Sequence, residues 1–138
     1  MGFIVTVGNN ITLGVETVQT VEFLVATPQD SNARTTDLGV TMKITGKILT
    51  ILDEGSESTV ELANWAMVPV EQADCYRSVT VKSVAAGQVV RQYILPTAFV
   101  VDYTETYGDT EGVGTFELII KQKKDKVQKT AITGGYAD

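Results

Sequence analysis

The sequence has 138 residues, 43% of them apolar, which is enough for one compact domain over residues 1–138. Seventeen acidic side chains against eleven basic ones give a net charge of −6, which argues against nucleic-acid binding that depends on phosphate neutralisation. Histidine is absent, and with it the commonest general base, triad partner and zinc ligand. We therefore expect no enzyme activity, no cofactor and no metal site.

The apolar runs are too short to predict a membrane-spanning segment. The longest, Ile94 to Val101, is interrupted by Pro96 and falls well below the roughly 18 residues that a span needs. The first residues lack the charged start and cleavage site of a secretory signal. We expect synthesis in the cytoplasm and no membrane partner.

The first elements expected along the chain are strands. Residues 3–7 form one apolar run, and Val21, Phe23 and Val25 then alternate with residues of the opposite face. Residues 28–37 follow as a polar stretch without a large apolar side chain, and we expect a long loop there.

The clearest strand pattern covers residues 40–48. Val40, Met42 and Ile44 point to one face, while Lys43 and Lys47 point to the other with the intervening threonines. Such alternation with period two is typical of a strand with one buried and one solvated face.

A single helix is expected at residues 58–67. Ser58 and Glu61 have the spacing of a capping box, in which each side chain bonds to a backbone N–H of the first turn. Leu62 and Trp65 then give an apolar stripe that ends before Pro69. Cys75, the only cysteine, excludes an intrachain disulfide and is expected to be a small buried residue.

The second half of the chain predicts a hairpin and two long strands. Residues 79–84 and 89–94 should pair across the short loop 85–88. The second of these runs continues to residue 103, with a bend at Pro96 because proline cannot donate to a ladder. A final strand is expected around residues 115–121.

The expected fold is therefore mostly β, with the core on the apolar faces of the strands and helix. The lysine-rich segment 121–138 reads as a strand end and tail, either solvated or facing an acidic partner. The candidate core residues are Val40, Met42, Ile44, Leu62, Trp65, Val79, Val81, Phe99, Phe116, Leu118 and Ile120.

No motif in the sequence predicts chemistry. Asp30 to Asn32 resembles the start of a calcium loop but lacks its glycine and its final glutamate at the required offsets. Gly112 to Gly114 precedes a strand instead of a helix, so it is better explained as a turn than as a phosphate loop. A hydrolase using Asp102, Glu105 or Asp109 is a third-ranked hypothesis, because no histidine could assist.

The order of these elements resembles the haemolysin co-regulated protein family and its phage tail tube relatives. The resemblance rests on 61–67, 79–84, 90–95, 98–103 and 112–120, which follow one another as a short helix, a hairpin, a valine-rich strand ending in tyrosine, and a final long strand. It implies two packed antiparallel sheets forming a β-barrel with one short flanking α-helix. It also implies hexameric rings that stack into a hollow tube.

The resemblance further implies partners and an interface. The partners are other copies of the chain and the sheath and baseplate proteins of an injection particle, which is assembled in the cytoplasm and then becomes virion-like or extracellular. Residues 1–14 do not match the start of the secretion branch, which favours a phage-tail or tailocin tube. The loop that corresponds to the family's inter-subunit loop comprises Pro28, Gln29, Asp30, Ser31, Asn32, Ala33, Arg34, Thr35, Thr36 and Asp37.

Two hypotheses of different classes remain. In the first, the chain is a structural tube subunit whose acidic net charge makes the lumen repel nucleic acid, and a lumen lined mainly by Lys43, Lys47 and Lys82 would contradict that charge. In the second, it is a monomeric β-barrel module that binds a ligand or peptide through its loops. The state of assembly distinguishes the two.

Overall fold

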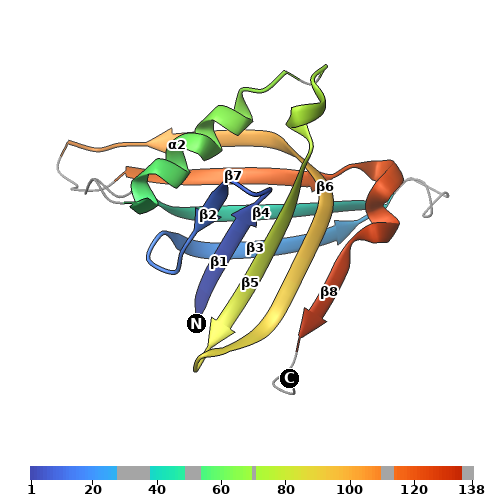
Figure 1. The fold of residues 1–138 in the computed structure, drawn as a ribbon, viewed down its shortest axis with the longest axis horizontal. Coiled ribbons are helices and arrows are strands. Elements are labelled where there is room, and N and C mark those ends of the chain that lie inside the picture. Colours follow the sequence, from blue (N-terminus) through green and yellow to red (C-terminus); the bar gives the residue numbers. More distant parts are fainter. Residues whose placement is uncertain (28–37, 49–53, 70, 110–113, 135–138) are drawn as a thin grey trace.

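The computed structural model describes residues 1–27, 38–48, 54–69, 71–109 and 114–134 (Figure 1). Its elements, in chain order, are β1 (Gly2–Val7), β2 (Ile11–Leu13), β3 (Val18–Ala26), β4 (Gly39–Ile48), α2 (Glu54–Ala66), η1 (Ala73–Cys75), β5 (Arg77–Ala85), β6 (Gln88–Thr106), β7 (Gly114–Gln122), η2 (Lys124–Lys129) and β8 (Ala131–Gly134). Here η marks a 3-10 helix.

All strands belong to one antiparallel sheet in the order β2-β1-β5-β6-β7-β4-β3, and β8 also pairs with β6. The mostly β fold with one flanking helix is confirmed. The two expected sheets are two layers of this single sheet, and its end strands β2 and β3 do not pair, so the described residues do not close a barrel.

The long strand β6 belongs to both layers (Figure 1). Its first half joins β1, β2, β5 and β8, which we call the β1–β5 layer. Its second half, residues 98–106, pairs with β7, and together with β4 and β3 it forms what we call the β4–β7 layer. In Figure 1 the β1–β5 layer crosses the β4–β7 layer, with α2 beside both.

Two bulges in β6 accompany the change from one layer to the other. Pro96 and Thr97 together oppose Ser78 of β5, because the pairing shifts between the residues that flank them. Val101 is likewise an extra residue opposite β7. Bulges bend a strand and increase its twist, and one of them removes Pro96 from the regular ladder. The bend expected at Pro96 is therefore present without a break in the strand.

The hairpin between β5 and β6 has a tighter turn than the sequence suggested. Ala85 pairs with Gln88, which leaves only Ala86 and Gly87 in the turn. Their φ angles are 53° and 76°, and positive φ at both positions is the requirement of a type I′ turn. This turn matches the right-handed twist of the flanking strands, which fixes the hairpin register.

The core lies between the two layers and beneath α2. All the candidate core residues are buried except Phe99, which is partly exposed. Phe99 follows the Pro96 bulge, and its ring packs edge-on against Tyr76 with centroids 5.9 Å apart. Buried core residues outside the expected set are Val5, Val7, Ile11, Leu13, Val18, Leu95 and Ala98.

The helix starts one turn earlier than expected. Because α2 begins at Glu54, Ser58 lies inside the helix and the capping-box interpretation is wrong. Residues three apart also face the same side within a helix, so the spacing of Ser58 and Glu61 does not by itself identify an end. Leu62 and Trp65 are buried as expected.

The lysine-rich segment is more ordered than the expected tail. After β7 the chain forms η2 and then β8, which pairs with residues 91–94 of β6. Val127 of η2 packs against the core. This anchoring holds the lysines of η2 at one end of the β4–β7 layer (Figure 1).

Candidate assembly surfaces

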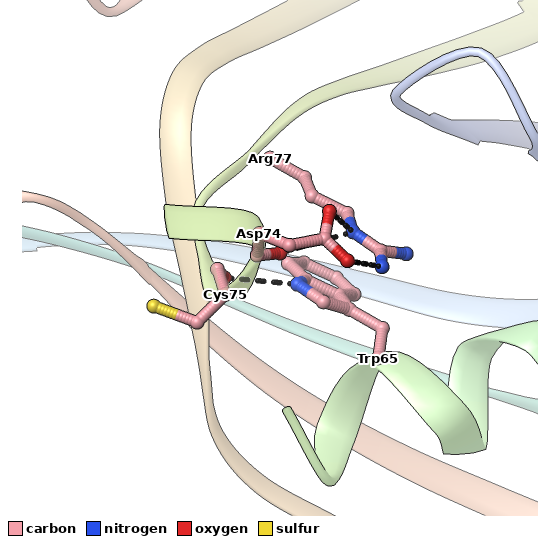
Figure 2. Close-up of polar contacts among 4 residues, drawn as sticks. All are labelled: Trp65, Asp74, Cys75 and Arg77. Carbon is pink, nitrogen blue, oxygen red and sulfur yellow. Dashed lines mark hydrogen bonds and ion pairs between the residues drawn. The ribbon is translucent and has the colours of Figure 1, made fainter. Parts of the chain in front are cut away.

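A cluster of polar contacts fixes the end of α2 to η1 and β5 (Figure 2). The indole nitrogen Nε1 of Trp65 donates to the carbonyl oxygen of Cys75 at 2.9 Å. Arg77 lies with its guanidinium carbon 5.7 Å from the Trp65 ring centroid and forms an ion pair with Asp74 at 2.7 Å. Because Trp65 is 1% exposed, these contacts satisfy the polar edge of a buried indole and have a structural role.

The carboxylate of Glu105 lies between two tyrosines at the end of β6. Its two oxygens accept hydrogen bonds from the hydroxyls of Tyr103 at 2.6 Å and Tyr107 at 2.9 Å. Tyr103 also stacks on Phe116 of the core, with ring centroids 6.3 Å apart. The carboxylate is thus held in a fixed position although it is exposed.

Both phenols hold their protons more tightly than usual. Burial, followed by the hydrogen bond to Glu105 and its negative charge, raises the pKa of Tyr103. For Tyr107 the hydrogen bond to Glu105 is the largest cause of its raised pKa. An anionic carboxylate favours the protonated phenol beside it, so the cluster is a set of stable donors to Glu105 and not a source of phenolate.

Two of the acidic residues of the hydrolase hypothesis, Asp102 and Glu105, do not converge as a catalytic pair. Glu105 is occupied by the two phenols, and Asp102 faces the opposite side of the strand, in register with Ile119 of β7. No group of three or more potential metal ligands comes together in the described part of the chain. None of its helices is long and apolar enough to cross a membrane.

The outer face of the β4–β7 layer is mostly polar and nearly balanced in charge, although Leu24 and Ile119 also lie on it. Lys43 of β4 lies 3.5 Å from Glu117 of β7 and is directly opposite Glu22 of β3. Lys47 is exposed on the same face, whereas Lys82 lies on β5 in the other layer. Threonines of four strands fill much of the remaining face: Thr20, Thr41, Thr45, Thr104, Thr106 and Thr115.

The β4–β7 layer ends on two long strand edges. β3 pairs only with β4, and residues 99–106 of β6 pair only with β7 among the described residues. On β3, Leu24 and Val25 are 57% and 44% exposed. A groove of about 520 Å³ lies between α2 and the β6 edge, and it includes the exposed side chains of Met67 and Val101.

The other layer presents much shorter edges. β2 has three residues and β8 has four. Short edge strands offer few unpaired backbone groups, whereas long and partly apolar ones are templates for pairing with another chain. The long edges of β3 and β6 are therefore the strongest candidate assembly surfaces of the described chain.

The expected interface loop, Pro28 to Asp37, lies outside the described residues. The edges of β3 and β6 could not be identified from the sequence, because which strands are terminal depends on the strand order. The local pattern gives one indication of an exposed strand: Leu24 and Val25 are adjacent apolar residues, and they cannot both face the core.

No family model matches the sequence, and no curated protein matches it. Several solved structures have the same fold. Hcp1 from Flavobacterium johnsoniae has a TM-score of 0.62 and 18% identity, over 98% of this chain and 97% of that one. Hcp1 from Salmonella typhimurium has a TM-score of 0.59 and 11% identity, over 97% and 95%.

A chain from the sheath-tube complex of PVC, an extracellular contractile injection system, has a TM-score of 0.55 and 12% identity, over 97% of this chain and 89% of that one. The fold of this protein is thus the fold shared by Hcp1 and the tube proteins of phage-tail-like particles. This agrees with the resemblance drawn from the order of its elements. Both kinds of structure occur among the matches, so they do not favour the phage-tail branch over the secretion branch.

Proposed function

We propose that this chain is a structural subunit of the inner tube of a contractile injection particle. Copies form a ring, most simply the hexamer that the family resemblance implies, and rings stack into a hollow conduit. The observation that carries the proposal is the pair of long edges on the β4–β7 layer, which no described strand pairs with. Its similarity in fold to the tube proteins supports it.

The two edges are suited to each other in direction. The four strands of the β4–β7 layer alternate in direction, so β3 and β6 at its two ends run antiparallel. A neighbour related by rotation about the tube axis therefore presents β3 antiparallel to residues 99–106 of β6. Such a head-to-tail contact repeats around an axis and closes, which leaves no free edge.

Apolar residues of the two edges lie at nearby levels of the sheet. The pairing register links Phe23 through β4 and β7 to Val100, and Leu24 to Phe99, which is two residues before Val101. Edge pairing brings the exposed side chain of Val25, which shares the inner face with Val40, towards the groove that contains Met67 and Val101, whereas Leu24 lies on the outer face with Thr41. Removing this apolar surface from water favours the contact.

In this arrangement the outer face of the β4–β7 layer lines the conduit. Its threonines and its paired charges, Lys43 with Glu117 and Glu22, make the wall polar and close to neutral. The proposed wall is thus close to neutral, in contrast to the acidic lumen that the net charge suggested. A polar wall of balanced charge gives passing cargo few strong attachment points.

In the proposed particle the tube subunit contacts two other kinds of protein. Sheath proteins surround the tube and baseplate proteins hold its end, and the subunit has no enzymatic role. We expect synthesis and assembly in the cytoplasm, after which the tube becomes part of an extracellular or virion-like particle. Similar chains come from structures of sheath-tube and baseplate complexes of such particles.

Negative-stain electron microscopy and sedimentation of the purified protein test the ring. We expect rings or tubes for the natural chain, and a folded monomer for Leu24→Lys, because a lysine on an edge strand opposes strand pairing. Val60→Lys is the matched control, since Val60 is 59% exposed on α2 and lies on neither edge. A natural chain that remains monomeric at high concentration favours the ligand-binding module instead.

A further inference from the structure

We infer that the two rims of each ring carry opposite charge, and that this charge makes the rings stack in one direction. The inference rests on the proposed function, because it takes the ring as given and concerns only the contact between rings. In a closed barrel the ends of the strands lie at the two rims. The two ends of the β4–β7 layer therefore face the neighbouring rings.

Among the described residues, one end of the layer is basic. β7 finishes there, and η2 follows with Lys124, Lys126 and Lys129, to which no described carboxylate is paired. Asp125, the acidic residue of η2, already forms an ion pair with Lys123 at 3.5 Å. We call this end, residues 121–129, the basic rim.

The opposite end is acidic. β6 finishes there with Glu105, followed by the exposed Asp109, and the turn before β3 adds the exposed Glu16. Thr17 in that turn accepts a hydrogen bond from the backbone of Lys47 at 2.7 Å, which places the turn at the same end. We call Glu16, Glu105 and Asp109 the acidic rim, and Lys47 is the described basic residue beside them.

The strand pairing separates the two rims. Glu105 is opposite Phe116 on β7, whereas η2 follows Gln122 at the other end of that strand. Six residues of strand correspond to about 20 Å at a rise of roughly 3.3 Å per residue. This exceeds the Debye length of about 10 Å at 0.1 M salt, so within one subunit the rims interact weakly and both remain available to neighbours.

The geometry of Glu105 suits a contact with lysine. The two phenol hydrogen bonds, at 2.6 and 2.9 Å, hold the carboxylate in place, so little side-chain freedom is lost when a cation approaches. Tyr107 is 63% exposed beside it and offers an aromatic ring to the same cation. The partner is therefore the η2 segment of a second copy in the adjacent ring.

Opposite charges on the rims also exclude the wrong arrangement. When rings stack head to tail, every contact joins an acidic rim to a basic rim. When one ring is inverted, like rims meet and repel each other. A tube with a uniform direction follows from this difference, without any further directional contact.

Charge reversal on each rim tests the inference. Glu105→Lys/Asp109→Lys makes both rims basic, and Lys124→Glu/Lys126→Glu/Lys129→Glu makes both acidic. We expect each variant to form rings but no tubes. Preformed rings of the two variants, mixed in equal amounts, should form tubes again, because alternating rings present opposite charges at every contact. Lys82→Glu/Arg91→Glu reverses two charges on the β5-β6 hairpin, away from both rims, and should stack like the natural chain.

A variant with neutral side chains controls for misfolding of the charge-reversed chains. Glu105→Gln/Asp109→Asn should also lose tubes while its circular dichroism stays that of the natural chain, and raising the salt concentration should shorten natural tubes. Reversed variants that stack normally, or a mixture that fails to form tubes, would overturn the inference. Natural rings that do not stack at low salt overturn it too but leave the ring intact, whereas a natural chain without rings overturns the proposed function itself.

Discussion

The two layers of the sheet differ in how they end. The β1–β5 layer finishes on β2 and β8, strands of three and four residues, and α2 packs beside it. The β4–β7 layer finishes on the nine residues of β3 and on the second half of β6, both with one unpaired side among the described residues. Long open edges in only one layer indicate that this layer is the one completed by other copies.

The comparison also separates two kinds of stability. The core between the layers stabilises the single chain, whereas the edges and rims act mainly between chains. Substitutions in the core should therefore lower the free energy of unfolding of the monomer, and substitutions on the edges should mainly alter assembly.

Removing Trp65 should break the attachment of α2 to the layers. Trp65→Ala leaves a cavity and removes the hydrogen bond to the carbonyl oxygen of Cys75, and we expect it to lower the free energy of unfolding by about 3–5 kcal/mol. Urea denaturation followed by far-ultraviolet circular dichroism measures this. Val60→Ala on the exposed side of the same helix should change little, and equal midpoints for the two variants would contradict the prediction.

The β4–β7 layer can be weakened without altering its edges. A Cβ atom at Gly46 would lie 2.7 Å from the ring of Phe116 and would also clash with the carbonyl oxygen of Thr17. Gly46→Ala should therefore cost about 1–3 kcal/mol of unfolding free energy, because the ring and the turn must both move.

Gly39→Ala is the control for this prediction. It lies in the same strand, and the nearest atom to its added Cβ is 3.8 Å away, which is an ordinary contact. Denaturation midpoints that fall equally in the two variants would show that loss of glycine, and not the close packing of Phe116, causes the effect.

The β1–β5 layer can be stabilised at its hairpin. Ala86 has φ of 53°, which is unfavourable for a residue with a Cβ, whereas asparagine tolerates this region and is favoured in type I′ turns. Ala86→Asn should raise the free energy of unfolding by about 0.5–1 kcal/mol. Gly87→Ala should lower the free energy of unfolding. A higher melting temperature for Gly87→Ala than for Ala86→Asn would contradict the assigned turn.

The smallest effect concerns the protons on the Glu105 cluster. In the folded chain the raised pKa values of Tyr103 and Tyr107 keep both phenols protonated above pH ~10, where an unfolded chain ionises. Their contribution to stability is therefore complete below that pH and is lost as the pH rises through the raised values.

Ultraviolet absorbance titration of the phenols tests this assignment. Glu105→Gln should shift the pKa of Tyr107 back towards its usual value, and that of Tyr103 less, because burial is the largest cause at Tyr103. Glu117→Gln, a carboxylate paired with Lys43 instead of a phenol, should leave the titration unchanged. Two identical titration curves for Glu105→Gln and the natural chain would contradict the role of Glu105.

Much of the fold could be predicted from local pattern. Alternation in residues 40–48 and 115–121 identified β4 and β7 and their buried faces, because the period of a strand is two and only one face of this layer is covered. Leu62 and Trp65 identified the buried side of the helix, whereas its start at Glu54 was missed. Phe99 was placed in the core by its apolar character, but the bulge before it changes the direction of its side chain.

The strands, their apolar faces and the order of elements follow from the sequence alone, since each depends on neighbours within a few residues. Strand pairing, seen only in the fold, joins the layers into one sheet through β6, makes β3 and β6 the long edges, and puts lysines and carboxylates at opposite ends. These features depend on which strands pair, and pairing joins residues far apart in the chain. Local alternation therefore cannot encode them on its own.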